Sequence, residues 1–531
     1  MTGFTPFPTD RAAAYRKAGY WSGKPLDEIL RSAAARWPDH AAVVDERTTL
    51  TYAELDQRAD AAAAGLAALG IGNDQCVLVQ LPNSCQFAVA LFGLVRAGAL
   101  PVMCLPGHRD AELAHFLDVS SATGIIVGTG AGFDYRTMAE RLLDRSDHLR
   151  HIIIDGDAGP HVSWSTLCSG DGRPPPLHPD TGAPALLLVS GGTTGAPKLI
   201  PRTHDDYVYN ATASARLCRL TNADVYLVAL PAGHNFPLAC PGLLGAMAVG
   251  ASVVFGTDPS PEAAFATIAR HRVTATALVP ALARLWAQAC EWEEQRPTTL
   301  RLLQVGGAKL TADDARHIRS VLTPGLQQVF GMAEGLLCYT RIGDPAEVVE
   351  HTQGRPLAEH DELRIVDDNG IASPDGEPGE LLVRGPYTIN GYFRAEAENQ
   401  RSFTEDGFYR SGDTVRRFAN GYLEVTGRVK DVILRAGETV SALDLESHLL
   451  THPAVYAAAT VGLPDPYLGE KICAAIVFRG RSVPLSELND HLDARGVAAH
   501  SRPDMVVPMR ALPTTAVGKV DKRTLVAHLC P

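Results

Sequence analysis

Apolar and polar residues follow two patterns that alternate along most of the chain. Continuous apolar runs such as Cys76–Leu81 are typical of buried strands, whereas Leu50–Leu69 repeats apolar positions at helical spacing, with Thr51 as the expected N-cap. Strands that alternate with helices predict parallel sheets whose faces are covered by helices, which is an α/β fold. The other strand candidates are residues 99–104, 123–127, 151–155, 185–189, 225–230, 252–255 and 274–279.

The pattern changes after about residue 350, where turn-forming pairs such as Asp375-Gly376 and Asn390-Gly391 separate short alternating strands. This texture predicts a small β-rich subdomain. From about residue 432 the strand and helix signals alternate again over a length that suits a small separate α+β domain. We therefore predict an N-terminal core of residues 1–427, made of parallel-sheet subdomains and the β-rich subdomain, a hinge at 428–431, and a C-terminal domain of residues 432–531.

Composition narrows the class of protein. The 531 residues are 46% hydrophobic and 20% charged, which is typical of globular domains and excludes bulk disorder. The formal net charge of −12 disfavours broad nucleic-acid binding, because that requires a basic face to displace counterions. We expect no nucleic-acid partner.

A membrane or exported protein is also disfavoured. Val225–Thr257 lacks Asp, Glu, Lys and Arg and is long enough to span a bilayer, but Pro231, Pro237 and Pro241 interrupt it. We interpret it as strand, loop and helix inside a globular core. The N-terminus has no basic segment followed by an apolar one, and the ten cysteines form no CxxC pair. We therefore expect a reduced, cytoplasmic protein without membrane contact.

Two glycine-rich segments each resemble part of a nucleotide-binding motif. Gly128–Gly132 follows a strand, but a dinucleotide fingerprint needs glycine at position 133, which is Phe133. Ser190–Lys198 lacks the Gly-Lys-Ser/Thr of a P-loop, yet it follows the apolar strand at 185–189 and concentrates glycines and hydroxyls before one lysine. Such a loop can surround an anion with N–H groups, although a polar surface loop is the plain alternative. We predict phosphate binding by Ser190, Gly191, Gly192, Thr193, Thr194, Gly195 and Lys198.

The segment Ser190–His204 resembles the phosphate loop of the adenylate-forming superfamily, which includes acyl-CoA synthetases, luciferases and the adenylation domains of peptide synthetases. Its continuation, Leu199–Tyr207, is similar to one branch, the stand-alone aryl acid–AMP ligases of siderophore pathways. The resemblance extends from Gly19 to Lys519. It implies an ATP- and Mg²⁺-dependent ligase that forms an acyl adenylate and pyrophosphate and then transfers the acyl group to a thiol, with a C-terminal domain that rotates between the two half-reactions.

Further motifs carry this resemblance. Val329–Gly335 resembles the adenine and magnesium motif, so Glu334 would help hold Mg²⁺ and serve catalysis, although from the residues alone it could be a helix-start carboxylate. Tyr409–Asp413 resembles the ribose motif, with Asp413 accepting the ribose hydroxyls. Gly427–Asp431 resembles the hinge motif, and Lys519 the C-terminal catalytic lysine. The remaining implied nucleotide contacts are Gly307, Val329, Gly331, Met332, Arg428 and the hinge pivot Lys430.

The aryl-acid pocket is expected at His234–Pro241. By resemblance His234 lies near the reacting carboxylate, Asn235 bonds an ortho hydroxyl and Phe236 forms a wall. Cys240 stands where relatives that use 2,3-dihydroxybenzoate generally have Ser, and Cys is only a weak donor. We therefore favour salicylate, with 2,3-dihydroxybenzoate or another ortho-substituted aryl acid as the alternative. Gly306, Ala308 and Leu337 are the other expected substrate contacts.

The expected thiol acceptor is the phosphopantetheine of an aryl carrier protein. Leu434, Ala436 and Thr439 replace the Asn, Gly and Lys that are common in relatives near the thiol channel, so coenzyme A or a small-molecule amine or hydroxyl stays open as acceptor. An aryl-CoA ligase is thus the second hypothesis. A non-catalytic nucleotide-binding relative is the third, disfavoured because binding alone would not require the full set of Lys198, Glu334, Asp413 and Lys519.

Overall fold

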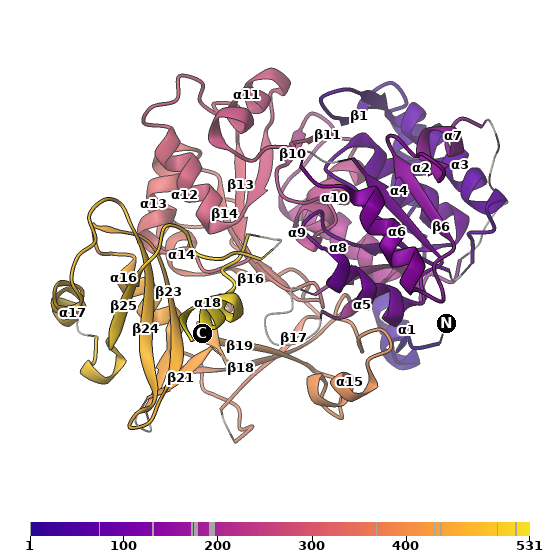
Figure 1. The fold of residues 1–531 in the computed structure, drawn as a ribbon. Coiled ribbons are helices and arrows are strands. Elements are labelled where there is room, and N and C mark those ends of the chain that lie inside the picture. Colours follow the sequence, from indigo (N-terminus) through magenta and orange to yellow (C-terminus); the bar gives the residue numbers. More distant parts are fainter. Residues whose placement is uncertain are drawn as a thin grey trace.

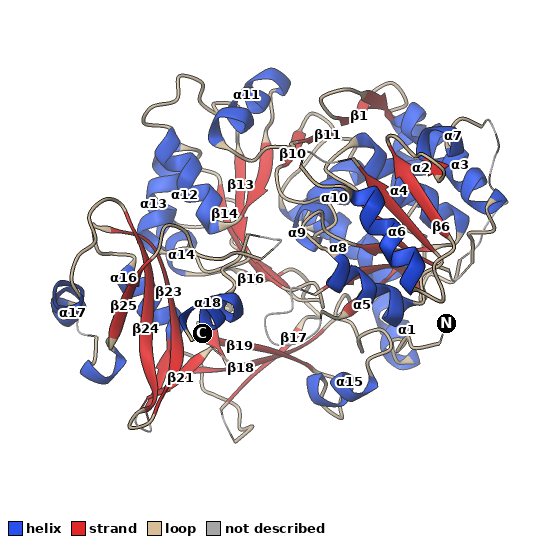
Figure 2. Ribbon diagram, in the orientation of Figure 1, coloured by secondary structure: helices blue, strands red, loops and turns tan. Residues whose placement is uncertain are grey.

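The computed structural model describes residues 2–73, 75–129, 132–170, 172, 174, 179–190, 197–367, 369–429, 431–435, 438–495, 497–515 and 518–530. These residues form two large mixed sheets, a small antiparallel sheet and a separate C-terminal sheet (Figures 1 and 2). The predicted fold class is confirmed.

The first large sheet has the strand order β7-β6-β5-β3-β4-β8-β9. Its strands are parallel except for the β8–β9 pair, which forms a hairpin. The bounds are β3 Cys76–Gln80, β4 Leu100–Met103, β5 Gly124–Gly128, β6 His151–Asp155, β7 Val162–Ser163, β8 Pro184–Val189 and β9 Leu199–Thr203.

The second large sheet has the order β16-β15-β14-β13-β12-β10-β11-β1-β2. Its centre is parallel, and antiparallel strands that the sequence analysis did not predict extend both ends. The bounds are β1 Ala41–Val44, β2 Thr49–Thr51, β10 Val225–Val228, β11 Ser252–Phe255, β12 Ala275–Leu278, β13 Leu302–Gly306, β14 Leu326–Gly331, β15 Leu337–Tyr339 and β16 Arg355–Pro356.

Helices fill the space between the two sheets and cover their outer faces. A capping box at Thr51 begins α3, and α4 is buried along almost its whole length, as its apolar sequence requires. The core between the sheets is formed by α2 (Glu28–Arg36), α3 (Tyr52–Ala68), α4 (Cys85–Ala97), α8 (His204–Leu217) and α10 (Gly242–Ala248). The outer helices are α5 (Asp110–Ser120), α6 (Tyr135–Arg145), α11 (Pro261–His271), α12 (Pro280–Ala289) and α13 (Ala312–Val321).

The segment at 225–257 is strand, loop and helix inside the core, as predicted: β10 is followed by α9 (Asn235–Ala239), α10 and β11. In the part of the chain that the structure describes, we find no helix with the length and apolarity needed to cross a bilayer. The remaining short helices are α1 Thr9–Lys17, α7 Trp164–Leu167, α14 Ala346–His351 and α15 Glu396–Ser402.

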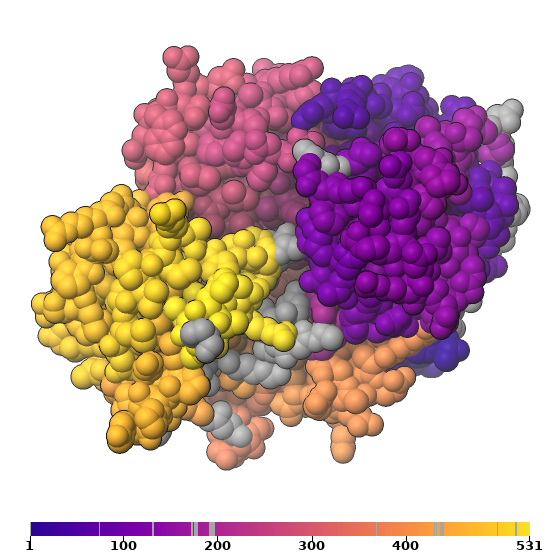
Figure 3. Space-filling view, in the orientation of Figure 1, coloured from indigo at the N-terminus to yellow at the C-terminus, as the bar shows by residue number. Residues whose placement is uncertain are grey.

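The small antiparallel sheet has the order β17-β18-β19-β20, and a different sheet begins a few residues after β20 ends at Arg428. Figure 3 shows this C-terminal part, in yellow, lying against the pink region of the N-terminal core. In the small antiparallel sheet the bounds are β17 Glu362–Val366, β18 Pro378–Arg384, β19 Tyr409–Arg417 and β20 Leu423–Arg428. The C-terminal part consists of β21 Val432–Arg435, β22 Glu438–Ser441, α16 Ala442–Leu449, β23 Val455–Asp465, β24 Gly469–Phe478, α17 Leu485–Ala494, a 3₁₀ turn Ala499–Ser501, β25 Met505–Pro508 and α18 Lys522–Leu529.

One buried cation links several of these elements. Arg202, on β9, has no exposed surface, and its Nε is 2.8 Å from Oδ1 of Asp206 on α8. Its remaining N–H groups donate to the carbonyl of Ala333 at 3.0 Å and that of Tyr387 at 3.2 Å. A buried ion pair is tolerated when further hydrogen bonds satisfy it, so Arg202 fixes the β8–β9 hairpin against α8 and against two distant segments.

Replacing Arg202 with methionine should destabilise the N-terminal core strongly, because Asp206 would keep a buried charge without its partner. Breaking such a pair typically costs about 3–5 kcal/mol, which should lower the midpoint of thermal unfolding by several degrees. Arg141→Met, which breaks an exposed pair with Asp110, is the matched control and should change the midpoint little. Equal midpoints for the two variants would contradict the role given to Arg202.

Candidate active site

The predicted phosphate loop connects the two strands of the β8–β9 hairpin, and its base is closed by two hydrogen bonds. The Ser190 N–H donates to the Lys198 carbonyl at 2.9 Å, and the Lys198 N–H donates to Ser190 Oγ at 2.8 Å. Both ends of the loop are therefore held at the strand ends. The predicted contacts Gly191, Gly192, Thr193, Thr194 and Gly195 lie outside the described residues.

Lys198 is paired with an acidic residue that the sequence analysis did not single out. Its Nζ lies 2.5 Å from Oε1 of Glu398 on α15 and 5.1 Å from the ring centroid of Tyr392. The hydrogen bond from Lys198 lowers the pKa of Glu398. The Lys198 side chain is thus held by Glu398 at the end of the predicted phosphate loop.

Glu334 lies in the turn between β14 and β15 and not at the start of a helix, which was the plain alternative. Its side chain is largely buried, and its Oε1 accepts a hydrogen bond from the Tyr392 hydroxyl at 2.8 Å. Within the same hairpin Gly331 pairs with Leu337. A Cβ at Gly331 would be 2.9 Å from the backbone carbonyl oxygen of Leu336, which cannot move aside as a side chain can, so glycine is favoured there. Met332 is half-buried in this turn and donates its N–H to the Leu336 carbonyl.

Asp413 and Arg428 are cross-strand partners on β19 and β20. The Arg428 Nε lies 2.8 Å from Asp413 Oδ1. Burial raises the pKa of Asp413, and the charges of Arg428 and Lys519 oppose that rise. A carboxylate held by cations at the edge of the site suits the acceptance of ribose hydroxyls, which the resemblance implied.

Lys519 reaches this cluster from the C-terminal domain. It ends a tight turn in which the Thr515 N–H donates to the Lys519 carbonyl at 2.7 Å and Gly518 adopts a φ of +77°. Its Cε lies 3.3 Å from the position that a Cβ would take at Gly307, itself at φ +89°. Burial and the charge of Arg428 lower the pKa of Lys519, while Asp413 and Glu334 raise it. The lysine therefore faces the carboxylates of the N-terminal core.

His234 is the N-cap of α9, and its Nδ1 accepts the Phe236 N–H at 3.3 Å. Burial, with the nearby charge of Lys519, lowers the pKa of His234 to about 3. The imidazole is therefore neutral at ordinary pH. Because Nδ1 is an acceptor, the proton resides on Nε2, which makes His234 a neutral hydrogen-bond donor.

The expected aryl pocket is a buried polar cluster along α9. The Tyr207 hydroxyl donates to Asn235 Oδ1 at 2.9 Å, and Asn235 Nδ2 donates to Cys240 Sγ at 3.5 Å. The Cys240 thiol donates in turn to the Asn235 carbonyl at 3.4 Å. Burial raises the pKa of Cys240 to about 12, so it stays a protonated thiol. The Asn235 amide is thus oriented with its NH₂ group toward Cys240.

Gly306 shapes the neighbouring wall. A Cβ at this position would lie 2.6 Å from the Val329 carbonyl and 3.2 Å from Cζ of Phe236. Only glycine lets the ends of β13 and β14 and the Phe236 ring approach so closely. Leu337 is buried, as a pocket residue should be, whereas Ala308 is exposed.

The structure brings most of the predicted residues together. The charge of Lys519 lowers the pKa of His234, and the charges of Asp413 and Glu334 raise the pKa of Lys519. Tyr392 links Lys198 to Glu334. The predicted pivot Lys430 lies outside the described residues. Sequence analysis missed Tyr207, Tyr392 and Glu398. Tyr207 belongs to the segment Leu199–Tyr207 that carries the family resemblance. However, an aromatic residue at helical spacing is typical of core packing, so the sequence contained no signal for its role.

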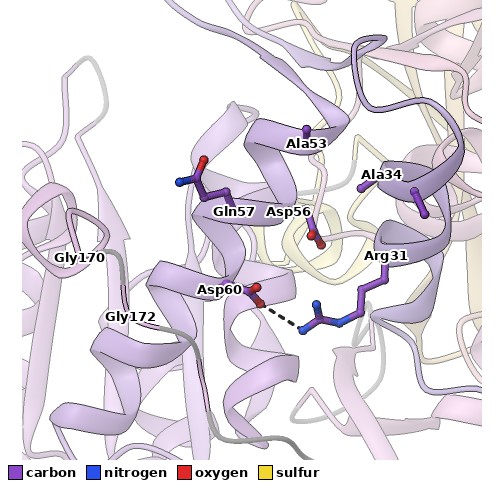
Figure 4. A pocket seen from close by; sticks show the side chains of 9 residues that line it. Arg31, Ala34, Ala53, Asp56, Gln57, Asp60, Gly170 and Gly172 are labelled. Carbon is purple, nitrogen blue, oxygen red and sulfur yellow. Dashed lines mark hydrogen bonds and ion pairs between the residues drawn. The ribbon is translucent and has the colours of Figure 1, made fainter.

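A cavity of about 620 Å³ lies elsewhere, between α2 and α3 (Figure 4). Arg31 and Asp60 form an ion pair in the wall of this cavity, with N and O atoms 3.1 Å apart. Its walls contain none of the predicted site residues; they are formed by Arg31, Ala34, Ala35, Ala53, Asp56, Gln57, Asp60, Gly170 and Gly172. We therefore place the active site at the cluster around Lys519 and not in this cavity.

Two large mixed sheets, an antiparallel subdomain and a C-terminal domain that inserts a lysine define an adenylate-forming enzyme. The family model described as AMP-binding enzyme matches residues 30–393, and the model for the AMP-binding enzyme C-terminal domain matches residues 444–519. The chain belongs to the AMP-binding enzyme family, whose members form adenylates from ATP.

Two curated relatives are similar over nearly the whole chain. The salicyl-AMP ligase / salicyl-S-ArCP synthetase of Mycobacterium tuberculosis is 68% identical, over 100% of this chain and 95% of the relative. The 2,3-dihydroxybenzoate-AMP ligase of Bacillus subtilis is 46% identical, over 99% and 97%. Among solved structures, apo MbtA of Mycobacterium smegmatis is 68% identical with a TM-score of 0.79, over 99% of this chain and 98% of that one.

Replacing His234 with asparagine should keep the helix cap but remove the Nε2–H donor. We expect kcat/KM for pyrophosphate exchange to fall about ten- to hundred-fold, the scale of one hydrogen bond to a charged group. The shape of the pH profile between about pH 6 and about pH 8 should not change, because His234 is already neutral there. His317→Asn, at an exposed position on α13, is the control. Loss of an acidic limb in the variant would show that His234 titrates in the working range.

Proposed function

We propose that this enzyme is a salicyl-AMP ligase that also transfers the salicyl group to an aryl carrier protein. In the first half-reaction a salicylate carboxylate oxygen attacks the α-phosphorus of ATP and pyrophosphate leaves. In the second, the phosphopantetheine thiol of the carrier attacks the acyl carbon and AMP leaves. The observation that carries the choice of substrate is the Asn235–Cys240 pair in the aryl pocket, and the 68% identical salicyl-AMP ligase supports it.

The nucleotide would lie between the phosphate loop and Asp413. We assign the phosphates to Lys198, Ser190 and residues 191–195, the ribose to Asp413, and the neighbourhood of the base to the β13 and β14 ends with Arg428 nearby. Lys519 would stabilise the charge that develops between the attacking carboxylate and the α-phosphate. The neutral Nε2–H of His234 would orient the carboxylate without adding a charge. The β13 and β14 contacts are Gly307, Val329, Gly331 and Met332.

Mg²⁺ fits this site as part of the substrate MgATP. Among the described residues no group of three or more His, Cys, Asp or Glu is arranged to hold a metal. Mg²⁺ in nucleotide enzymes is commonly bound by one or two carboxylates together with substrate phosphates, and the single buried carboxylate of Glu334 suits that pattern. Bound Mg²⁺ would offset phosphate charge during the attack.

Salicylate suits the pocket better than 2,3-dihydroxybenzoate. One N–H of the Asn235 NH₂ group donates to Cys240, and the other can donate to the ortho hydroxyl or to the carboxylate. A ring 3-hydroxyl would meet Cys240, whose thiol already donates to the Asn235 carbonyl. A buried hydroxyl without a good partner costs about 1–3 kcal/mol, which disfavours the dihydroxylated acid. Phe236, Gly306, Leu337 and Ala308 would form the remaining contacts.

We further propose that residues 1–427 and 432–531 move relative to one another about residues 428–431, including Lys430. The change of sheet between Arg428 and Val432 supports this division. Rotation would withdraw Lys519 after adenylation and admit the thiol. Leu434, beyond the hinge, is exposed on β21. We place the enzyme in the cytoplasm, since ten cysteines scattered along so long a chain without a CxxC pair are typical of a reduced protein.

Pyrophosphate exchange across a panel of aryl acids tests the proposed function. We expect exchange that depends on the aryl acid, with the highest kcat/KM for salicylate. Transfer assays with a phosphopantetheinylated aryl carrier protein and with coenzyme A then identify the acceptor, and we expect the carrier protein. Nucleotide binding without any exchange would contradict the assignment, and efficient transfer to coenzyme A alone would identify an aryl-CoA ligase.

Lys519→Ala should abolish adenylate formation but leave transfer from a supplied salicyl adenylate largely intact. A preorganised charged group of this kind is typically worth a factor of about 10²–10³ in rate. The measurement compares pyrophosphate exchange with single-turnover transfer. Near-normal exchange in the variant would show that Lys519 does not serve the first half-reaction.

Cys240→Ser should raise the relative efficiency with 2,3-dihydroxybenzoate. The new hydroxyl could bond the ring 3-hydroxyl, and with salicylate it would still find the Asn235 carbonyl that the thiol uses now. The change therefore rests on one gained hydrogen bond of about 0.5–1.5 kcal/mol, or about two- to ten-fold. The ratio of kcat/KM for the two acids checks this. An unchanged ratio would mean that Cys240 does not line the ring 3-position.

A further inference from the structure

Tyr392 lies where two parts of the nucleotide site meet. Its hydroxyl donates to Glu334 Oε1 at 2.8 Å, and its ring face lies 5.1 Å from the Nζ of Lys198. The residue is buried, with 3% of its surface exposed. One side chain thus contacts both the carboxylate assigned to MgATP and the lysine assigned to the phosphates.

The hydrogen bonds around Tyr392 run in one direction. A carboxylate can only accept, so the single hydroxyl proton of Tyr392 is committed to Glu334. The Tyr409 hydroxyl lies 3.0 Å from that of Tyr392 and must therefore donate to it. Burial raises the pKa of Tyr392 and of Tyr409, and the charge of Glu334 raises both further, so both hydroxyls stay protonated. Tyr409 begins β19, the strand that carries Asp413, so the chain of hydrogen bonds extends from the ribose strand to Glu334.

The backbone of Tyr392 is also fixed. Its N–H donates to Asn399 Oδ1 at 2.7 Å, and its carbonyl accepts from Asn399 Nδ2 at 3.0 Å. Asn399 follows Glu398 on α15, and the Glu398 carboxylate is further held by Arg401 at 2.9 Å. The carboxylate that pairs with Lys198 and the ring beneath Lys198 are therefore parts of one rigid unit.

We propose that Tyr392 is a positioning residue that orients Glu334 toward MgATP and holds Lys198 over its ring, and that Glu398 retains Lys198 until the nucleotide phosphates replace it. A hydrogen bond on one oxygen fixes the carboxylate rotamer of Glu334. The ion pair of Glu398 would keep the lysine charge compensated before nucleotide binds and would be given up when phosphate binds. This inference rests on the proposed function only in taking MgATP as the ligand.

Binding titrations without aryl acid test the Tyr392 part. Tyr392→Phe keeps the ring under Lys198 but removes the hydroxyl. We expect its affinity for MgATP, measured by calorimetry, to fall about ten-fold, while the affinity for ATP in excess chelator stays at the parent value. In a Glu334→Gln background the same substitution should cause no further loss. Tyr135→Phe, which removes a tyrosine hydroxyl that donates to the Pro106 carbonyl and to no residue assigned to the site, is the matched control.

An equal loss with and without the metal, or a full additional loss in the Glu334→Gln background, would overturn the positioning role of Tyr392.

The proposed role of Glu398 is tested with its own variant. Glu398→Gln should bind ATP in excess chelator about three- to ten-fold more tightly than the parent protein, because Lys198 would no longer have to break an ion pair before it binds the phosphates. Glu396→Gln, an exposed position on the same helix, is the control. Unchanged or weaker binding by Glu398→Gln would show that Glu398 does not retain Lys198.

The outcome is separable from that of the proposed function. The parent protein is assayed in parallel for salicylate-dependent pyrophosphate exchange. If it binds MgATP but shows no exchange, the proposed function fails, and the titrations still decide the role of Tyr392. If exchange is normal and the Tyr392→Phe titrations match the parent, only the inference about Tyr392 fails.

Discussion

The guanidinium of Arg202 cannot reach water, so its partners must be inside the protein and must stay in place. Those partners lie on either side of the active site. Asp206 belongs to α8, the helix that supplies Tyr207 to the aryl pocket, and the Ala333 carbonyl immediately precedes Glu334. The Tyr387 carbonyl belongs to a residue whose hydroxyl bonds the backbone of Leu337. The distance between the phosphate loop, the Glu334 carboxylate and the aryl pocket therefore depends on one buried charge.

The other half of the site has the opposite property. Lys519 enters from a separate domain on a short turn, and its Cε lies beside Gly307. Burial and the charge of Arg428 lower its pKa, while Asp413 and Glu334 raise it. Under the proposed domain rotation, a fixed site for nucleotide and acid would be combined with one removable cation. Burial and the charge of Lys519 lower the pKa of His234 to about 3, so this imidazole adds no positive charge beside Lys519. This division suits an enzyme with two half-reactions.

The fold and much of the site could be predicted because local signals marked them. The apolar runs at 76–81 and 151–155 became β3 and β6, and the Thr51 cap began α3. Glu334 and Lys519 were singled out by the resemblance of their motifs to a known family. Antiparallel edge strands such as β15 and β16 were missed, because their pairing depends on tertiary register and not on local periodicity. Tyr392 and Glu398 were missed for a similar reason. Tyr392 and Glu398 are assigned to the site only through their contacts with Glu334 and Lys198, which are remote in sequence.

We propose that one pocket between Phe236, Asn235, Cys240 and Gly306 receives the aryl ring while Asp413 and Lys519 hold the adenylate. A crystal structure of this enzyme with a non-hydrolysable salicyl-adenylate mimic tests this arrangement. We expect the ribose hydroxyls on Asp413, the ortho hydroxyl on the Asn235 amide, and the ring 3-position in contact with Cys240. An aryl ring bound away from Cys240, or a ribose bound without Asp413, would contradict the claim.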